Sequence, residues 1–473
     1  MTERPNIALM TEAQKEALIM VLWEELEQIK QENAQLKQQH AQDQSRLEQL
    51  KQLEQQQNQP KKNSHNSSVP PSRDQKLNKP APDQTRQRRK ASLGRKGGGR
   101  SLHPKPDQHV VSLAKVCPHC EGALEPEEQQ LKARYDKIEI PPVRPIVTRV
   151  EQYGGTCPHC GGCYVAPIPL GLEPGTPFGR SIETLATYLR YSHAISYERL
   201  SALFGEVFGL SISEGALANL FKKRVGSRLG DRTEEILERL RSSRVVMSDE
   251  TSARVGGVNQ WEWVFQNEQV CIHVIRPSRG HGVIDEVMDG HRPEVWVSDL
   301  YSAQGNHPAE HWQICLAHQL RDLEYAIEAG DKIFARAMKR LLLRAFALEK
   351  RRLKEPTFAR YRRDLSVRLE KVLALEPVQK DGIRLKKRYV KHREHLFLFL
   401  DDASVPPTNN ASEQALRMSV VFRKVTNGFR SDWGRDLFAS VRTVVNTGRR
   451  QGMTAFEAIQ KALSPLTSFF SPV

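Results

Sequence analysis

The sequence predicts a multidomain α+β protein, with an N-terminal coiled coil, a cysteine-rich module, a helical region and an α/β core that carries a helical insertion. Three observations lead to this prediction. A heptad pattern runs through residues 19–50, two CPHC motifs are separated by 36 residues, and short apolar strands begin near residue 244. With 473 residues, the chain has the length of about two to four domains.

Residues 1–57 are predicted to form a coiled-coil oligomerisation helix. Seven of the ten heptad core positions are apolar, and Asn33 is the kind of buried polar residue that fixes a two-stranded register. A single helix packed on its own chain is the alternative. We favour self-association into a homodimer or a higher oligomer. The core positions are Ile19, Leu22, Leu26, Ile29, Asn33, Leu36, His40, Asp43, Leu47 and Leu50.

Residues 58–106 are predicted to be a disordered basic linker. Residues 58–105 hold thirteen Lys and Arg against two Asp, and Pro, Gly, Ser and Asn dominate the rest. The net charge of the whole chain is +15, which favours a polyanionic partner such as DNA over a merely solvated basic surface. The candidate phosphate-binding residues of the linker are Arg88, Arg89, Lys90, Arg95 and Lys96.

Residues 107–170 are predicted to form a zinc-binding module. Each CPHC motif can place two thiolates on one tight turn, and four thiolates complete the tetrahedral shell of a structural Zn²⁺. The predicted ligands are Cys117, Cys120, Cys157 and Cys160, and Cys163 is a competing ligand or a small packing residue. The alternating stretch between the two motifs predicts a β-hairpin.

Residues 171–242 are predicted to be helical. Within them, SYERLSALFGEVFGLSISEGALANLFKKR has the outline of a helix, a turn with glycine and a second helix capped by Ser213. Such an outline fits a DNA-binding helix-turn-helix and an ordinary helical hairpin equally well.

Residues 243–450 are predicted to form the core domain. RVVMSD at 244–249, QWEWVFQ at 260–266 and QVCIHVIRP at 269–277 are expected strands. A short helix, the strand EVWVSDL at 294–300, a second helix and the strand WQICLAH at 312–318 follow. Three strands, a helix, a strand, a helix and a fifth strand are the order of the ribonuclease H-like fold. The Lys- and Arg-rich residues from about 319 to 400 are an expected helical insertion, and residues 451–473 form a C-terminal segment.

Two of these strands are expected to end on acidic residues that lie next to each other. Asp249 closes the first strand and Asp299 closes the fourth, which are neighbours in this fold. Two close carboxylates repel each other unless a cation neutralises them, and Mg²⁺ is the natural oxygen-seeking ion. A single Asp at the end of a strand could simply cap the following loop. Two such aspartates, each closing a short apolar strand in a basic protein, favour a metal site instead.

The stretch TNNASEQALR at 408–417 predicts a helix start. Asn410 is the expected cap, and Glu413 three residues later completes a capping-box pattern. Glu413 is also a carboxylate held at the first helical turn, so it either only starts the helix or takes part in chemistry. A third carboxylate beside the two aspartates would allow a second ion.

The ordered set of motifs resembles the DDE transposases of the insertion sequence 66 family. It comprises NSHNSSVPPSRD, GRKGGGR, two CPHC motifs, SDET, VSDLYSA, CLAH, TNNASEQALR and RKVTNGFRSDWG, from the linker to about residue 450. The resemblance implies that Asp249, Asp299 and Glu413 are the catalytic triad. It also implies two Mg²⁺ or Mn²⁺ ions, DNA partners at the transposon ends and the target, and accessory transposition proteins.

The resemblance also implies a reaction and further residues. Metal-activated water cleaves a transposon-end phosphodiester, and the released 3′-OH then attacks target DNA. His318 is a candidate accessory residue, with a packed or capping histidine as the alternative, and Tyr301 as a nucleophile is the rival chemistry. Gln414 stands where the family commonly has Arg, so Arg417 or Arg423 is expected to bind the phosphate instead. The candidate DNA contacts after the glutamate are Arg417, Arg423, Lys424 and Arg430.

Two other functions remain open at this point: an inactive DNA-binding regulator, and a ribonuclease H-like nuclease that cuts without joining. No apolar run approaches the length of a membrane span, and the N-terminus lacks the layout of a signal peptide. We therefore expect a bacterial cytoplasmic protein without a membrane partner, associated with the nucleoid when it is bound to DNA.

Overall fold

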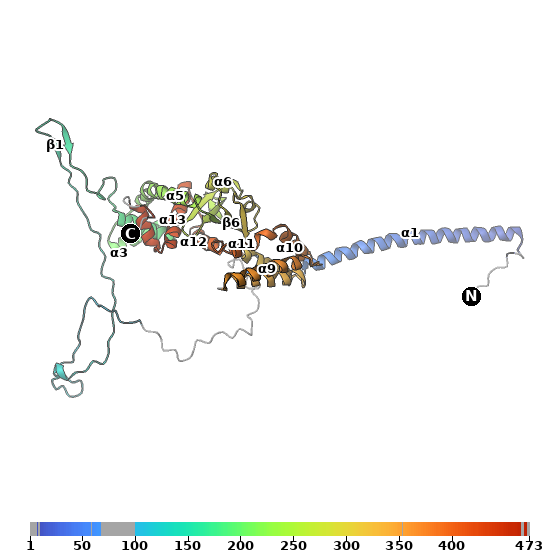
Figure 1. The fold of residues 1–473 in the computed structure, drawn as a ribbon, viewed down its shortest axis with the longest axis horizontal. Helices are drawn as coiled ribbons and strands as arrows, with labels where there is room; N and C mark the ends of the chain where they lie inside the picture. The colour runs from blue at the N-terminus through green and yellow to red at the C-terminus, as the bar shows by residue number, and fades with distance from the viewer. Residues whose placement is uncertain are drawn as a thin grey trace. The chain divides into compact units, whose positions relative to one another are not determined.

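The computed structural model describes residues 7, 10–57, 59–67, 100–351, 353–464 and 468–470. They divide into two compact units (Figure 1). Unit 1 comprises residues 1–79 and 318–393, and unit 2 comprises residues 80–317 and 394–473. The predicted linker contacts Arg88, Arg89, Lys90, Arg95 and Lys96 lie outside the described residues. None of the helices in the described part of the chain is both long and apolar enough to span a membrane.

Unit 1 is built from helices. Each of α8, α9 and α10 buries apolar side chains four residues apart, such as Leu365, Leu369 and Leu373 of α9, which gives one apolar stripe per helix. The rings of Phe334 on α8 and Tyr389 on α10 have centroids 6.2 Å apart. The helices are α1 (Glu12–Gln57), α7 (Leu316–Glu328), α8 (Phe334–Glu349), α9 (Glu355–Leu373) and α10 (Lys380–Lys391), followed by a 3-10 turn at Arg393–His395.

Helix α1 leaves its apolar heptad positions exposed. Leu26 is 50% exposed and Leu36 is 63% exposed. The side chain of Asn33 donates to the carbonyl oxygen of Ile29 on the same helix, at 3.0 Å. Burying these leucines therefore requires contact with something beyond the chain's own described residues.

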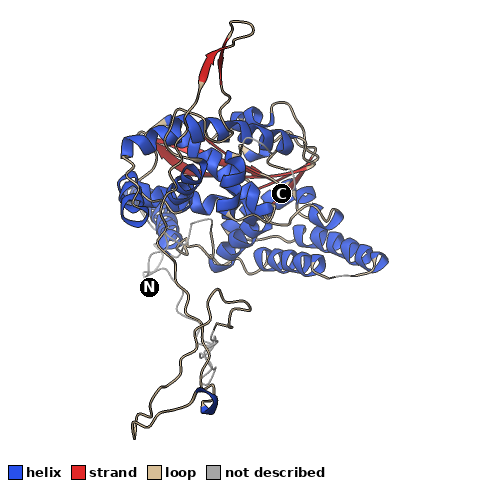
Figure 2. Cartoon of the chain, turned by 90° about the vertical axis from the view of Figure 1, so that its left-hand side faces the viewer, coloured by secondary structure: helices blue, strands red, loops and turns tan. Residues whose placement is uncertain are grey.

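A five-stranded mixed sheet forms the centre of unit 2, with helices packed around it (Figure 2). The strand order is β5-β4-β3-β6-β7. β3, β4 and β5 are antiparallel neighbours, whereas β6 and β7 run parallel to β3. The strands are β3 (Val245–Val255), β4 (Val258–Gln266), β5 (Cys271–Arg276), β6 (Val295–Ser298) and β7 (His311–Ile314).

The five strands occur in the predicted order, with two corrections. β3 does not end at Asp249 but continues to Val255, because its second half pairs with β4 through a turn at Gly256 and Gly257. Both glycines have positive φ, which a two-residue hairpin turn requires. Between β6 and β7 the predicted helix is only a 3-10 turn at Gln304–Asn306, while α6 (Gly282–Met288) links β5 to β6 as expected.

The helices before the sheet share one hydrophobic core with it. Leu217 and Leu229 from these helices lie in the same buried cluster as Trp263 and Trp296 from the sheet. Ser213 caps its helix as predicted, by accepting from the backbone N–H of Ala216. The elements are α2 (Arg180–Ser192), α3 (Tyr197–Phe208), α4 (Glu214–Asn219), a π-helix (Leu220–Val225) and α5 (Gly226–Arg241).

The helices after the sheet cover one face and one edge of it. Ala415 and Leu416 of α12 pack against Val264 of β4 and Cys271 of β5. Thr443 of α13 accepts a hydrogen bond from a backbone N–H of the edge strand β5, which keeps that edge from pairing with another strand. The helices are α11 (Leu398–Asp401), α12 (Asn410–Thr426), α13 (Asp432–Arg450) and α14 (Ala455–Leu463).

The hairpin predicted between the CPHC motifs is not formed. Residues 129–153, all of which the structure describes, contain no strand. Pro141, Pro142 and Pro145 interrupt this stretch, and proline cannot donate to a strand ladder. A short hairpin of β1 (Gly154–Thr156) and β2 (Cys163–Val165) encloses the second CPHC motif instead, and a 3-10 turn at Pro126–Glu128 follows the first.

Candidate active site

The register of the parallel strands places Asp249 beside Asp299. Val245 pairs with Val295, and Met247 pairs with Val297. The paired stretch ends there, and Asp249 on β3 and Asp299, the first residue after β6, each stand two residues beyond it. Asp249 accepts a hydrogen bond from the backbone N–H of Glu250 at 2.9 Å, and Asp299 accepts one from the backbone N–H of Tyr301 at 2.9 Å. Both aspartates are half-buried.

The helix that carries Glu413 is fastened to β3 at this point. The residue that precedes α12 is Asn409, not the predicted Asn410, and its side chain makes no capping bond to the helix backbone. Instead, Nδ2 of Asn409 donates to the carbonyl oxygen of Ser248, at 2.6 Å. Ser248 immediately precedes Asp249, so the start of α12 lies against the strand that carries the first aspartate.

Further contacts fix the same helical turn. The backbone N–H of Asn409 donates to Sγ of Cys315 at 3.1 Å, and its Oδ1 accepts from the hydroxyl of Ser412 at 2.5 Å. Gln266 of β4 donates to the same hydroxyl at 2.8 Å. Asn409 is 1% exposed. A buried amide that satisfies both its donor and its acceptor groups holds its position firmly.

Glu413 lies one turn further along α12, on the side that faces the sheet. Its backbone N–H donates to the carbonyl oxygen of Asn409, and the side chain is half-buried. Leu416, three residues later, packs against Val264 of β4, and residues three apart share one side of a helix. The predicted capping box between Asn410 and Glu413 is absent, because the helix starts one residue earlier than expected.

The three carboxylates come from neighbouring elements without forming one metal-binding group. Among the residues that the structure describes, no three His, Cys, Asp or Glu side chains lie close enough together to hold a metal ion. The donor set itself suits Mg²⁺ or Mn²⁺, since all three side chains offer carboxylate oxygens. Asp249 and Asp299 follow the paired stretches of two neighbouring strands, and Glu413 is a third carboxylate, on α12.

Glu250 is a further carboxylate at this site that the sequence analysis missed. Its side chain is 2% exposed, accepts a hydrogen bond from Gln304 at 2.8 Å and pairs with Arg279 at 2.8 Å. Burial raises the pKa of the Glu250 carboxyl, and the charge of Asp299 raises it further. The sequence signal was the acidic doublet DE, which puts a second carboxylate directly after Asp249.

The remaining predicted residues near the site occupy different environments. Arg423 donates to the hydroxyl of Ser252 on β3, at 3.1 Å. His318 is half-buried in the first turn of α7. The predicted DNA contacts Arg417, Lys424 and Arg430 have exposed side chains.

Each CPHC motif forms the same compact turn. The backbone N–H of Cys117 donates to the carbonyl oxygen of Gly122 at 2.9 Å, and that of Cys157 donates to Gly162 at 2.8 Å. Backbone N–H groups of the following residues lower the pKa of both first cysteines, which favours the thiolate form that a metal needs. Nevertheless, within the described residues the structure does not gather Cys117, Cys120, Cys157 and Cys160 into one group.

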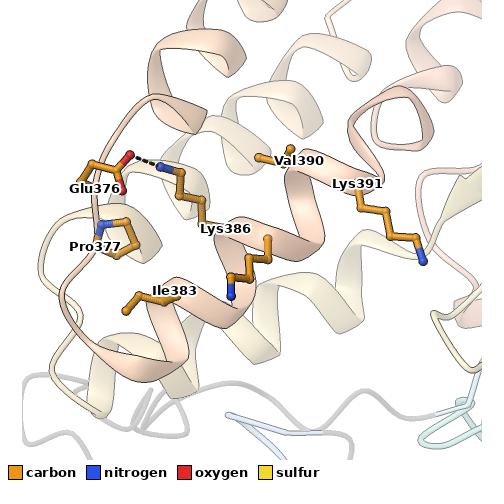
Figure 3. Close-up of a pocket in the computed structure, with 7 residues that line it drawn as sticks. Glu376, Pro377, Ile383, Lys386, Val390 and Lys391 are labelled. Atoms are coloured by element: carbon orange, nitrogen blue, oxygen red, sulfur yellow. Dashed lines mark hydrogen bonds and ion pairs between the residues drawn. The ribbon is translucent and has the colours of Figure 1, made fainter.

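A groove of about 360 Å³ lies on α10 in unit 1 (Figure 3). Pro377, Ile383 and Val390 supply its apolar surface, and Lys386 turns toward Glu376, with 2.5 Å between the charged atoms. None of the predicted site residues lines this groove.

The comparison with known families bears on this arrangement. A family model described as Transposase IS66 family matches residues 175–436, more than half of the chain. The chain belongs to the IS66 transposase family. The IS66 match includes Asp249, Asp299 and Glu413, and both cysteine motifs precede it. A search of curated proteins found no match for this IS66-family chain.

Proposed function

We propose that the chain is a DDE transposase that cleaves the ends of an insertion sequence and joins the released 3′-OH to target DNA. Membership of the IS66 transposase family makes DNA its expected substrate. One observation carries the assignment of the site. The Asn409 side chain binds the Ser248 carbonyl, so the helix with Glu413 starts beside the strand that carries Asp249.

We infer a ribonuclease H-like core from the sheet. Three antiparallel strands followed by two parallel ones, in the order β5-β4-β3-β6-β7, support this inference. The helices α7 to α10 would then be the insertion between the fifth strand and the helix of the third carboxylate. The 113 residues between Asp299 and Glu413 accommodate it.

In this proposal Asp249, Asp299 and Glu413 hold two Mg²⁺ or Mn²⁺ ions. Bound ions would supply the Lewis acidity that activates water or a 3′-OH and that stabilises the leaving oxygen. The protein's part is to hold the aspartates adjacent and to present Glu413 from a fixed helical turn. The Glu413 side chain would turn toward the aspartates when ions and DNA bind.

Other parts of the chain would serve DNA binding and assembly. The α1 helices of two chains would form a coiled coil and bring two transposon ends together. The two CPHC turns would share one structural Zn²⁺, and accessory transposition proteins would be further partners. Candidate phosphate contacts are Arg88, Arg89, Lys90, Arg95, Lys96, Arg417, Arg423, Lys424 and Arg430, with His318 as an accessory residue.

A strand-transfer assay tests this function. The full chain is incubated with labelled DNA of the insertion-sequence end, target plasmid and Mg²⁺ or Mn²⁺. We expect cleaved and joined products from the wild type, and a loss of at least about 100-fold in Asp249→Asn, because neutralising one ligand weakens ion binding. Asp231→Asn is the matched control, since Asp231 is an exposed carboxylate on α5.

The alternatives give different products. Cleavage without joined DNA indicates a nuclease, and binding without cleavage in either metal indicates a regulator. Equal activity of Asp249→Asn and the wild type would contradict the assignment of the site.

A further inference from the structure

Arg279 is held between two aromatic rings next to the acidic pair. Its guanidinium carbon lies 3.8 Å from the centroid of the Tyr301 ring and 4.4 Å from the centroid of the Trp261 ring. Cation–π contacts of this kind fix the plane of a guanidinium group. Arg279 therefore has a defined orientation, unlike a long side chain that moves freely in solvent.

Glu250 binds one edge of the same guanidinium group, the edge formed by Nε and Nη2. Nε and Nη2 of Arg279 both donate to Oε1 of Glu250, at 3.1 and 2.8 Å. Gln304 donates to the other carboxylate oxygen at 2.8 Å, and Gln304 is itself fully buried. The edge of Arg279 that faces the protein interior is thus completely engaged.

The opposite edge of Arg279 faces outward. The side chain of Arg279 is 37% exposed, whereas that of Glu250 is 2% exposed. No hydrogen bond or ion pair engages Nη1 of Arg279 among the residues that the structure describes. Arginine has five N–H donors in a planar fork, so at least the two on Nη1 remain for a ligand, and a phosphate matches such a fork.

Two neighbours of Arg279 link it to Asp299. The backbone N–H of Tyr301, whose ring stacks on Arg279, donates to Asp299 at 2.9 Å. Glu250, the ion-pair partner of Arg279, is close enough to Asp299 to feel its charge. A ligand on Nη1 of Arg279 would therefore lie on the side of the site where Asp299 stands.

We propose that Arg279 is a substrate-binding residue that donates to a DNA backbone phosphate adjacent to the reacting one. This proposal rests on the proposed function, because it assumes DNA at Asp249 and Asp299. The carboxylates of Asp249, Asp299 and Glu413 repel the phosphates of a DNA strand. A preorganised arginine near them offsets part of that repulsion.

A purely structural role for Arg279 is the competing explanation. In that case Arg279 serves only to neutralise the buried carboxylate of Glu250. Removing both charges together would then restore wild-type DNA binding and its salt dependence. The phosphate-binding role predicts the opposite, because the Glu250→Gln, Arg279→Gln double variant still lacks the donor. This double variant also keeps the test valid if Arg279→Gln alone fails to fold.

The experiment is a DNA-binding measurement across a salt series. Fluorescence anisotropy follows the full chain binding to a fluorescein-labelled duplex of the insertion-sequence end. The buffer contains no Mg²⁺, Mn²⁺ or chelator, so that cleavage plays no part and bound Zn²⁺ is retained. For Arg279→Gln and the double variant we expect about tenfold weaker binding, and a slope of log K against log salt that is smaller by about 0.9.

Arg276→Gln is the matched control. Arg276 ends β5 three residues earlier, is 34% exposed and makes its ion pair with Glu286 on α6. We expect this variant to keep the wild-type slope. If Arg279→Gln and the double variant keep it as well, or if Arg276→Gln loses as much, the proposal is wrong.

The outcomes separate this proposal from the proposed function. Strand transfer by the wild type with an unchanged slope in both Arg279 variants overturns only the role of Arg279. A reduced slope without any cleavage or joining in Mg²⁺ or Mn²⁺ keeps Arg279 as a phosphate contact and overturns the proposed function.

Discussion

The side-chain amide of Asn409 donates to the backbone carbonyl of Ser248, with 2.6 Å between nitrogen and oxygen. These residues are 161 positions apart in the sequence. The bond fixes the start of one helix against the middle of one strand, at the position of the first predicted catalytic aspartate.

Asn409→Ala should therefore impair joining more than folding. The variant leaves a buried carbonyl without its donor, which costs about 1–3 kcal/mol of unfolding free energy. A displacement of Glu413 by about 1 Å should lower strand transfer by about 100-fold. The neighbouring Asn410 is exposed, so Asn410→Ala is the matched control. Equal strand-transfer rates for the two variants would contradict the positioning role of Asn409.

His307 should make unfolding depend on pH. Burial, together with the charge of the nearby His395, lowers the pKa of His307 to about 4, and its ring stacks on Trp296 with centroids 5.7 Å apart. In the unfolded chain its pKa is about 6.5, so between about pH 4 and 6.5 the unfolded state binds more protons. The free energy of unfolding should therefore fall as the pH drops through this window.

Urea titrations followed by tryptophan fluorescence measure this effect. His307→Phe keeps an aromatic ring at this position and should reduce the change between pH 7 and pH 4.5 by on the order of 1 kcal/mol, discounted because His307 is only half-buried. His281→Phe is the control, since His281 is exposed at the start of α6. An identical pH profile in the wild type and in His307→Phe would refute the assignment.

Zinc binding should require the CPHC cysteines and not Cys163. Purified wild type should contain about one zinc ion per chain, and Cys120→Ser should lose most of it, because three thiolates leave the tetrahedral shell incomplete. Cys163 lies in β2, next to the second motif, and Cys163→Ser should keep the metal. Elemental analysis after dialysis measures the zinc content of the wild type and of both variants. Zinc-free wild type, or equal loss in Cys163→Ser, contradicts the predicted ligand set.

The exposed leucines of α1 should drive self-association. Leu36→Asp removes an apolar side chain from each helix of a dimer and should weaken dimerisation by roughly 100-fold or more. Gln35→Asp adds the same charge outside the heptad core and should leave the dimer intact. Light scattering on size-exclusion fractions gives the mass directly. A monomeric wild type, or a dimer that survives Leu36→Asp, would show that α1 does not form the predicted coiled coil.

The strands of unit 2 were predictable because each is a short apolar run. The order of strands along the chain followed from the sequence, and the parallel pairing of β3 with β6 brings together the two predicted aspartates. The extension of β3 was missed although its signals were present. Residues 252–255 alternate between exposed and buried, and the two glycines that follow form the hairpin turn.

The supporting residues of the site could not be predicted from local pattern. Asn409 and Asn410 are equally good helix caps by residue type, and only the tertiary contact with Ser248 distinguishes them. The stacking of Arg279 on Tyr301 depends on how a loop after β5 meets a loop after β6. Such contacts are set by the arrangement of the sheet, which sequence spacing does not specify.

The contact between Asn409 and Cys315 has a consequence for how this chain could change over time. The backbone N–H of Asn409 donates to Cys315 Sγ, and the N–H of Leu316 donates to the carbonyl of Pro407. The residues between Leu316 and Pro407 therefore leave the core and return to it at the same place. Its length and content can be altered, or another helical domain grafted in, while the ends that the core needs stay joined.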